Sequence, residues 1–317
     1  MLSVWTANSE FKSFPKLNED IKTQVAVIGG GITGILCACM LKQKGIDCVV
    51  LEADRVCKGV TQNTTAKITS QHGLVYDKLI KHFGIEKAQT YLKANENAVK
   101  KYREMCKEIS CDFQNKNNYV YSVNDSRKIE KELHALVRIG YNPDFCGEIP
   151  VPVNIAGAVI FQNQAQFNPL QFLSFISKGL TIYENTKVIE IRGKHAFTQE
   201  AKITADYFIV ATHFPFMNKF GMYSLKLFQE RSYVIALENG PKIDGMYVDE
   251  AKKGMSFRNY ENYLLIGGGD HRTGKDGGNY RELRAFSGIH YPSNPIKYQW
   301  ATQDCMSLDS VPYIGRY

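Results

Sequence analysis

The first fifty residues show a pattern of apolar and polar positions that predicts a strand, a turn, a helix and a second strand. Residues 25–28 are consecutive apolar residues, which indicates a buried strand. An apolar-rich helical stretch then runs to Lys44, and Gly45 is typical of the residue that follows a helix. Residues 48–51 form the next apolar strand. This order of elements predicts an α/β fold.

The turn between the first strand and the helix reads Gly-Gly-Gly-Ile-Thr-Gly, which satisfies the pattern G-x-G-x-x-G. In such a turn Gly29 permits the tight bend, Gly31 leaves room for a pyrophosphate, and Gly34 lets the helix pack closely on the sheet. The N-terminus of the helix offers N–H groups and a partial positive charge to phosphates. Glu52, at the end of the second strand, is placed to accept hydrogen bonds from a ribose. These residues predict a dinucleotide site; the alternative is a glycine-rich turn in an ordinary α/β core.

The remaining pattern predicts helices in the middle of the chain and strands toward its C-terminal part. Apolar residues spaced by three and four from 88 to 109 indicate one long amphipathic helix, and residues 125–139 indicate another. Asn168 and Pro169 are typical of a helix start, and that helix should reach Lys178. Shorter apolar runs predict strands at residues 119–122, 158–161, 180–183, 187–192, 207–212, 233–237, 245–248, 255–258 and 263–266, with the glycines from 267 to 274 closing the last.

Composition, charge and cysteine usage narrow the class of protein. A chain of 317 residues with 44% apolar content can bury a large core and favours two domains. The net charge of +7 is scattered along the chain, which favours a solvated surface over a nucleic-acid patch. The 8 cysteines show no metal-ligand spacing, so no metal site is predicted.

Residues 25–41 carry no charge, so a membrane-spanning segment is the alternative interpretation of this stretch. This stretch falls just short of the roughly 18 residues needed to span a bilayer, and glycines interrupt it. The segment before it lacks the features of a signal peptide. We therefore expect a cytoplasmic protein without a membrane partner.

The polar segment that follows Glu52 contains a G-x-T-x-x-T-T-A-K motif, formed by Gly59, Thr61, Thr64, Thr65, Ala66 and Lys67. With this motif the chain resembles the D-amino-acid-oxidase-like superfamily of FAD-dependent oxidoreductases, which includes glycine and sarcosine oxidases. It is most similar to the bacterial members that often carry a C-terminal Rieske domain. The resemblance implies that the loop lies along the flavin of FAD, with its threonines reaching the pyrophosphate or the ring. The alternative is a polar surface loop that joins two elements.

Further segments carry the same resemblance. Thr186, Lys187 and Val188 match the family's turn in which the valine would meet the adenine through its backbone. The strand at residues 207–212 ends in Ala211 and Thr212 and matches the family's A-x-x-x-I-V-A-T strand, which passes the diphosphate. The resemblance thus assigns a set of residues to cofactor binding: Gly29, Gly31, Gly34, Glu52, Arg55, Gly59, Thr61, Thr64, Thr65, Val188, Ala211, Thr212 and Gly315.

The resemblance also supplies candidate catalytic residues. In the superfamily, a strand–turn–strand unit covers the flavin face where substrate lies, and here it corresponds to residues 255–258 and the strand that ends in the glycines before His271 and Arg272. A histidine suits proton transfer near neutral pH, and an arginine suits anion binding. The full candidate set comprises His271, Lys67, His72, Arg258 and Arg272. The alternative for His271 and Arg272 is that they are solvent-facing loop residues.

Two domains follow from this reading. A Rossmann-like FAD-binding domain is predicted at residues 1–82, 153–213 and 300–317. A second α+β domain with a mixed sheet, which would cover the substrate, is predicted at residues 83–152 and 214–299.

The predicted activity is oxidation of a small amine-type substrate, with hydride transfer from a C–N bond to the flavin N5. One departure from the family bears on the substrate: Asp304 stands where amino-acid-oxidising members carry an arginine for the substrate carboxylate. An acid there would favour an amine or amide N–H. Oxygen, a protein electron carrier or a Rieske iron-sulfur domain would accept the electrons. The alternatives are a flavin-binding electron-transfer or scaffold module without turnover, and an NAD-dependent dehydrogenase.

The C-terminal residues 309–317 resemble the family's D-x-x-P-Y-I-G-R motif. In the family a further strand, a glycine turn and a helix aimed at the flavin follow this motif. We therefore expect a C-terminally truncated chain, whose missing portion could include a Rieske domain.

Overall fold

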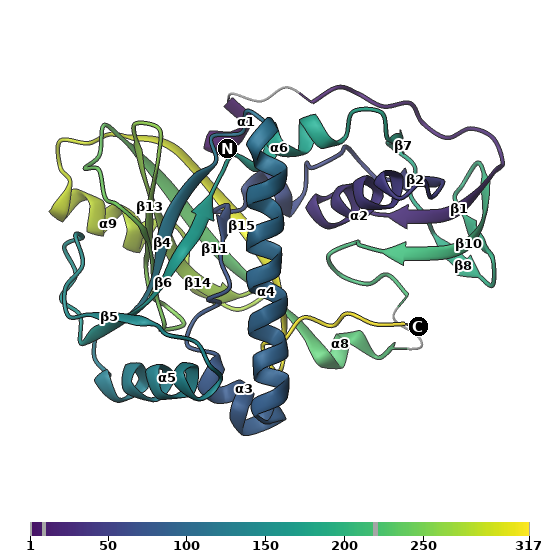
Figure 1. The fold of residues 1–317 in the computed structure, drawn as a ribbon. Coiled ribbons are helices and arrows are strands. Elements are labelled where there is room, and N and C mark those ends of the chain that lie inside the picture. Colours follow the sequence, from purple (N-terminus) through teal and green to yellow (C-terminus); the bar gives the residue numbers. More distant parts are fainter. Residues whose placement is uncertain (1, 8–10, 218–220, 317) are drawn as a thin grey trace. The chain divides into compact units, whose positions relative to one another are not determined.

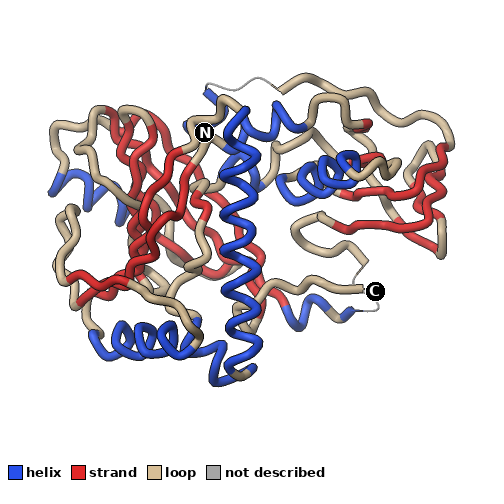
Figure 2. The backbone as a smooth tube through the Cα atoms, in the orientation of Figure 1, coloured by secondary structure: helices blue, strands red, loops and turns tan. Residues whose placement is uncertain are grey.

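The computed structural model of the chain describes residues 2–7, 11–217 and 221–316, which form two compact units (Figures 1 and 2). Unit 1 comprises Met1–Val4, Thr65–Asn168 and Glu230–Thr302. Unit 2 comprises Trp5–Thr64, Pro169–Gln229 and Gln303–Tyr317. Both units are therefore assembled from segments that lie far apart in the sequence. The functions predicted for the two domains remain predictions.

Unit 2 contains a 6-stranded sheet in the order β7-β2-β1-β10-β9-β8. Strand β1 lies between β2 and β10 and is parallel to both, and β7 extends the parallel part beside β2. β9 and β8 add an antiparallel edge. The bounds are β1 Ile21–Ile28, β2 Cys48–Leu51, β7 Thr181–Tyr183, β8 Glu190–Arg192, β9 His195–Phe197 and β10 Lys202–Val210.

The helices of unit 2 include the one predicted after the glycine turn. Helix α2 (Ile32–Gln43) packs against β1 and β2, as Figure 1 shows, and Gly45 adopts a left-handed φ of +72° just beyond its end. This geometry explains why the helix stops there, since glycine adopts positive φ without strain. The other helices with residues in this unit are α1 Val4–Ala7, the 3₁₀ turn η1 Val60–Asn63, α6 Pro169–Ile176 and α8 Tyr223–Lys226.

Unit 1 is built on a 9-stranded mixed sheet in the order β15-β11-β14-β13-β12-β4-β6-β3, with β5 beside β6. The recorded pairs within it are antiparallel except β12 with β4, which is parallel. The bounds are β3 Lys67–Ile68, β4 Gln114–Ser122, β5 Asp144–Cys146, β6 Gly157–Gln166, β11 Leu227–Glu238, β12 Met246–Asp249, β13 Ser256–Tyr260, β14 Tyr263–Arg272 and β15 Ile296–Ser307.

Helices pack on this sheet, and a buried carboxylate joins two of them. Helix α4 (Ile85–Met105) packs against α3 (Tyr76–Phe83) and β6, and α5 (Ser126–Arg138) packs against α3, β4 and β6. Glu132 of α5 is buried and accepts the N–H groups of Tyr76 at 2.8 Å and Asp77 at 2.9 Å. A carboxylate at this place caps the first turn of α3. Burial raises the pKa of Glu132, which the two hydrogen bonds oppose.

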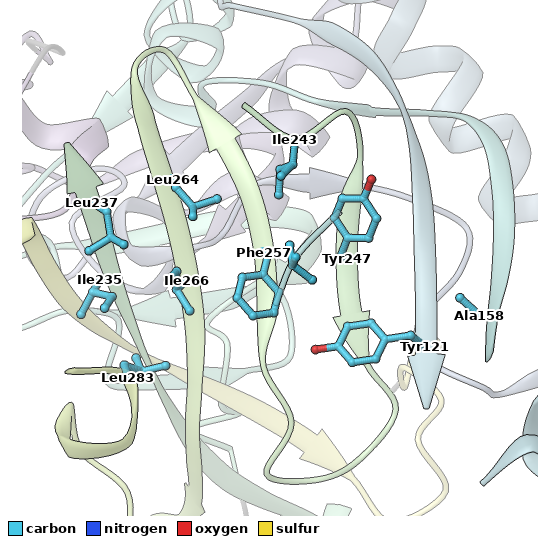
Figure 3. Packing of buried hydrophobic residues seen from close by; sticks show 11 residues of the cluster. Tyr121, Ala158, Ile235, Leu237, Ile243, Tyr247, Phe257, Leu264, Ile266 and Leu283 are labelled. Carbon is cyan, nitrogen blue, oxygen red and sulfur yellow. The ribbon is translucent and has the colours of Figure 1, made fainter. Parts of the chain in front are cut away.

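One hydrophobic cluster of unit 1 lies on one face of the sheet and includes helix α9 (Arg281–His290) through Leu283 (Figure 3). Phe257 of β13 and Ile266 of β14 belong to this cluster. Successive side chains of a strand point to opposite faces, so the neighbour of Phe257, Arg258, points away from this cluster. Arg258 is nevertheless only 1% exposed. This part of the sheet is therefore buried on both faces.

The strands and helices named from the sequence are confirmed, with some changes of extent. The long helix runs from Ile85 to Met105 and then tightens into the 3₁₀ turn η2, Cys106–Glu108. Strand β14 was expected to end at Ile266 but continues to Arg272. Side chains at Gly267 and Gly269 would approach Ser256 Oγ to 2.6 Å and the Asn279 carbonyl oxygen to 2.7 Å. These glycines thus mark close packing within a strand instead of its end.

Candidate functional site

Each of the three motif glycines in the turn of unit 2 occupies a different local environment. Gly29 has a φ of +107°, and a Cβ there would collide with the carbonyl oxygen of Ala211. A Cβ at Gly34 would collide with the carbonyl oxygen of Gly29, so the first turn of α2 lies directly on the preceding bend. Gly31, the N-cap of α2, has an ordinary φ of −81°. Among the described residues, a Cβ at Gly31 would meet only Thr61 Oγ1, at 3.2 Å.

The N-terminus of α2 is held by Thr61 from the G-x-T-x-x-T-T-A-K loop. The buried Thr61 hydroxyl accepts the N–H of Ile32 at 3.0 Å. The first N–H groups of a helix have no intrahelical acceptor and carry the positive end of the helix dipole. The cradle left by the missing side chain at Gly31 therefore lies beside N–H groups suited to a diphosphate. These residues fit the dinucleotide predicted from the sequence.

Glu52 is fixed at the C-terminal end of β2 by backbone hydrogen bonds. Its Oε2 accepts the N–H of Gly30 at 2.6 Å, and its Oε1 accepts the N–H of Asp54 at 2.9 Å. The backbone N–H of Thr186, in the turn before Val188, donates to the Glu52 carbonyl oxygen at 2.8 Å. An ionised carboxylate offers about four lone-pair sites. Glu52 thus keeps acceptor capacity for the two hydroxyl groups of a ribose.

A buried carboxylate that was not predicted, Glu184, organises the segment containing Arg55. Glu184 follows β7, is 1% exposed, and accepts the N–H groups of Val56 at 2.8 Å and Phe14 at 3.2 Å. Its Oε2 lies 3.3 Å from Nε of Arg55, whose Nη2 donates to Ser13 Oγ at 3.2 Å. A glutamate directly after the apolar strand 181–183 is the one sequence signal that could have indicated it.

The other residues predicted to bind the cofactor differ in burial and in hydrogen bonding. Val188 is buried in the core of unit 2, so its backbone is the part available to a ligand. Ala211 donates its N–H to the Ile28 carbonyl oxygen at 2.8 Å, and the Thr212 hydroxyl donates to the Phe214 carbonyl oxygen at 3.0 Å. Gly59 and the exposed Gly315 lie where an added Cβ would meet nothing within 4 Å among the described residues.

Three consecutive carbonyl groups of the threonine loop are held by buried side chains from distant parts of the sequence. Within unit 2, the Trp5 indole N–H donates to the Thr64 carbonyl oxygen at 2.8 Å. Within unit 1, Nη1 of Arg258 donates to the carbonyl oxygens of Thr65 at 2.8 Å and Ala66 at 2.7 Å. Burial lowers the pKa of Arg258 to about 9, so the side chain remains protonated at neutral pH.

Two candidate catalytic residues, His271 and Arg272, are neighbours at the end of β14. The His271 ring stacks on Tyr233 with centroids 5.8 Å apart, and His271 lies opposite Arg231 in the strand register. Its Nδ1 atom is buried and has no hydrogen-bond partner among the described residues. Arg272 is exposed and lies opposite Glu230 in the register.

Lys67 and His72 lie near the start of unit 1 in the chain. Nζ of Lys67 donates to Thr65 Oγ1 at 3.2 Å, so Lys67 and Arg258 both contact Thr65. His72, in the loop before α3, has its Nδ1 3.0 Å from the hydroxyl of Tyr91 on α4. Desolvation lowers the pKa of His72, although the side chain as a whole stays exposed. The contacts recorded within unit 1 therefore unite Lys67 with Arg258, and His271 with Arg272, but connect His72 to neither pair.

Neither a metal-binding cluster nor a membrane-spanning helix occurs in the described part of the chain. No cluster of three or more His, Cys, Asp or Glu side chains in residues 2–7, 11–217 and 221–316 has an arrangement that could hold a metal ion. Across the same residues, every helix is too short or too polar to cross a membrane.

The chain matches a family of FAD dependent oxidoreductases and is similar to proteins named as an iron-sulfur protein and an oxidoreductase. A family model described as FAD dependent oxidoreductase matches residues 24–317. The Bacillus subtilis protein YhfW, named as a Rieske 2Fe-2S iron-sulfur protein, is 35% identical over 98% of this chain and 65% of its own length. The gamma-glutamylputrescine oxidoreductase of Escherichia coli is 25% identical over 64% of this chain and 52% of its own length. The chain thus spans somewhat more than half of the length of these relatives.

Solved structures share the fold. Glycine oxidase from Geobacillus kaustophilus aligns with a TM-score of 0.71 at 15% identity and covers 93% of this chain and 86% of its own. L-proline dehydrogenase from P. horikoshii aligns with a TM-score of 0.74 at 17% identity and covers 96% and 86%. At these identities the likeness concerns the fold alone. It confirms the predicted Rossmann-like FAD-binding fold with a second mixed-sheet domain.

Proposed function

Since the chain belongs to the family of FAD dependent oxidoreductases, we propose that it oxidises the C–N bond of a small amine-type substrate with FAD as its cofactor. The observation that carries the cofactor assignment is the cradle at Gly31, which is bounded by Thr61 and the first turn of α2. Glu52 at the end of β2 adds the fixed carboxylate that a ribose requires. Bound FAD supplies the two-electron oxidation.

The proposed cofactor contacts follow from the chemistry of each group. The N–H groups at the start of α2 would bind the diphosphate, Glu52 the ribose, and the backbone at Val188 the adenine. Thr64 and Thr65 would reach the pyrophosphate or the flavin through their hydroxyl groups. The residues of unit 2 in this set support its assignment as the FAD-binding part of the chain.

Two groups in unit 1 are proposed to act on the substrate. His271 has a buried ring nitrogen without a partner among the described residues, which suits a group that holds or moves a proton. Arg272 beside it is exposed and would bind an anionic part of the substrate. Lys67 and His72 are retained as alternative proton-handling groups, since each has a polar neighbour that could orient it.

An amine-type substrate is supported by the names of similar proteins and by Asp304. The Escherichia coli relative is named after gamma-glutamylputrescine, and two of the solved structures are named after glycine and L-proline. Asp304 is exposed on β15, where a carboxylate would repel a carboxylate substrate and attract an ammonium group. We propose a protein electron carrier or oxygen as the electron acceptor. The name of YhfW supports a Rieske iron-sulfur partner among the carriers.

The test is anaerobic mixing of the purified flavoprotein with a panel of amines and amino acids while the flavin absorption is recorded. Bleaching by at least one amine without a carboxylate, and weaker bleaching by amino acids, is the expected result. A protein that carries no flavin would refute the cofactor assignment. A protein that holds flavin but is bleached by none of these compounds would favour an electron-transfer module without turnover.

A further inference from the structure

We infer that Arg258 is a positioning residue: it clamps the Thr65 and Ala66 carbonyl groups and so fixes the end of the threonine loop that lines FAD. The inference rests on the proposed function for the cofactor role of this loop. It assigns Arg258 a task in the interior of unit 1 instead of contact with the substrate.

The geometry of the contact is that of a buried clamp. Arg258 lies in the middle of β13, opposite Leu265 of β14, and is 1% exposed. One NH₂ group of its guanidinium, Nη1, donates to two successive carbonyl oxygens at 2.8 and 2.7 Å. Hydrogen bonds from a charged donor are stronger than those from neutral donors. A single side chain thus satisfies two neighbouring backbone acceptors.

The backbone at Ala66 is strained in a way that makes this contact possible. In an extended chain, successive carbonyl groups point to opposite sides, so one donor cannot reach both. Ala66 instead has a left-handed φ of +55° and is buried. A residue other than glycine adopts this conformation only when its surroundings enforce it. The bonds from Arg258 to the carbonyl oxygens on either side of this residue favour the strained turn.

The chain on either side of the clamp is also anchored. After Ala66, Lys67 and Ile68 form β3, which pairs with Gln166 and Ala165 of β6. The Gln166 side chain in turn donates to the carbonyl oxygen of Asn259, the neighbour of Arg258, at 3.0 Å. Before the clamp, Trp5 holds the Thr64 carbonyl oxygen. Arg258 is therefore the cationic member of a set of side chains that fix the loop end through its backbone.

Ordering of the loop by Arg258 should strengthen FAD binding. Without it, the free energy needed to order the loop would reduce the affinity for FAD. Fixing the backbone of one residue costs about as much free energy as a tenfold change in affinity. With Arg258 present, Thr64 and Thr65 are held in place before the cofactor arrives. Without it, the left-handed turn at Ala66 would relax and the threonine side chains would lose their direction.

The experiment compares Arg258→Met, Arg258→Lys and the control Phe257→Leu. Phe257 is the adjacent residue of the same strand, but its side chain lies in the hydrophobic cluster on the other face (Figure 3). Flavin fluorescence quenching gives the Kd for FAD of each apoprotein, and hydrogen exchange with mass spectrometry gives the protection of the amides at residues 64–68. Thermal unfolding gives the stability of each variant.

Arg258→Met is expected to raise the Kd for FAD by about tenfold and to speed exchange at residues 64–68. Arg258→Lys, which keeps one cationic donor, should recover part of the affinity. Phe257→Leu should lower the Tm without changing the Kd or the exchange. If Arg258→Met does not fold, Arg258→Lys carries the comparison, with an intermediate Kd expected.

Wild-type Kd and wild-type exchange in the Arg258 variants would overturn the inference, as would an equal loss of affinity in Phe257→Leu. A changed KM for an amine at unchanged Kd for FAD would show that Arg258 contacts the substrate instead. Failure of the wild-type protein to bind FAD would refute the proposed function and the cofactor role of the clamp. In that case the exchange data on the apoprotein still decide whether Arg258 orders the loop.

Discussion

The Gly31→Ala substitution should weaken FAD binding with little effect on stability, whereas alanine at Gly29 or Gly34 would also disturb the fold. Gly31 has a φ of −81° and a ψ of −174°, which alanine adopts without strain. The added Cβ would meet only Thr61 Oγ1, at 3.2 Å, among the described residues. Replacing an N-cap glycine by alanine costs about 0.5–1 kcal/mol. The Tm of the apoprotein should therefore fall by no more than about 4 °C.

The same methyl group would occupy the space proposed for the diphosphate. Overpacking of this kind costs about 1–3 kcal/mol, which corresponds to a roughly 5- to 150-fold rise in the Kd for FAD. The assay is titration of apoprotein with FAD, followed by flavin fluorescence, beside thermal unfolding of the same sample. The matched control is Gly34→Ala, whose Cβ collides with the Gly29 carbonyl oxygen before any ligand arrives.

Gly34→Ala should therefore lose stability as well as affinity, with a fall in Tm of roughly 6–12 °C if the clash costs ~3 kcal/mol. Gly31→Ala should lose affinity alone. A Gly31→Ala protein that purifies with wild-type flavin content and wild-type Kd would refute the cradle. A Gly31→Ala protein as unstable as Gly34→Ala would show that Gly31 serves packing instead of a ligand.

Four further outcomes are expected. Glu132→Ala should lower the free energy of unfolding by about 2–3 kcal/mol, because it leaves two N–H groups of α3 without their buried acceptor, and urea unfolding measures this. Because the folded-state pKa of Glu132 is raised, the proton-linked part of its contribution to stability is full below about pH 4.3 and is lost as pH rises through the folded-state pKa. The free energy of unfolding of the wild type relative to that of Glu132→Gln should therefore fall as pH rises from about 4.3 to the folded-state pKa. A difference that does not change with pH would contradict the raised pKa. Glu184→Ala should release the Arg55 segment and speed its proteolysis in unit 2, whereas unchanged cleavage would argue against Glu184 as its anchor. The pKa of the Cys305 thiol is raised, by burial and by Asp304, which disfavours a thiolate that could attack flavin. Acid precipitation should therefore leave the flavin in the supernatant, and yellow protein in the pellet would indicate a covalent bond.

The parts of the fold that the sequence predicted are those fixed by local pattern. Residues 25–28 and 48–51 were recognisable because buried parallel strands are continuous apolar runs, and both are strands in the structure. Helix α5 was recognisable from its period and from Asp125, whose side chain accepts the N–H of Lys128. Helix α9 was missed because its sequence, RELRAFSGIH, contains a glycine and a serine that weaken the helical signal.

The parts of the candidate site that the sequence could not predict depend on contacts between distant residues. Glycine spacing pointed to Gly29, Gly31 and Gly34 because their task is set by the turn itself. The sequence around Trp5 and Arg258 gives no indication that each side chain donates to a carbonyl oxygen of the threonine loop. The strand continuing through Gly267–Arg272 was missed for a related reason, since what the glycines accommodate lies on other segments.

The pairing of β1 with β10 has a consequence for the synthesis of the protein. Strand β1 carries the glycine motif at its end, and its central position depends on a partner in which Ile203 pairs with Ile21. At 5–20 residues per second, roughly 10–40 seconds separate the appearance of these two strands on the ribosome. During that time the apolar edge at residues 25–28 has no strand to cover it, and exposed edges of this kind promote aggregation. The nascent chain therefore exposes this edge of β1 until residues 202–210 have emerged to pair with it.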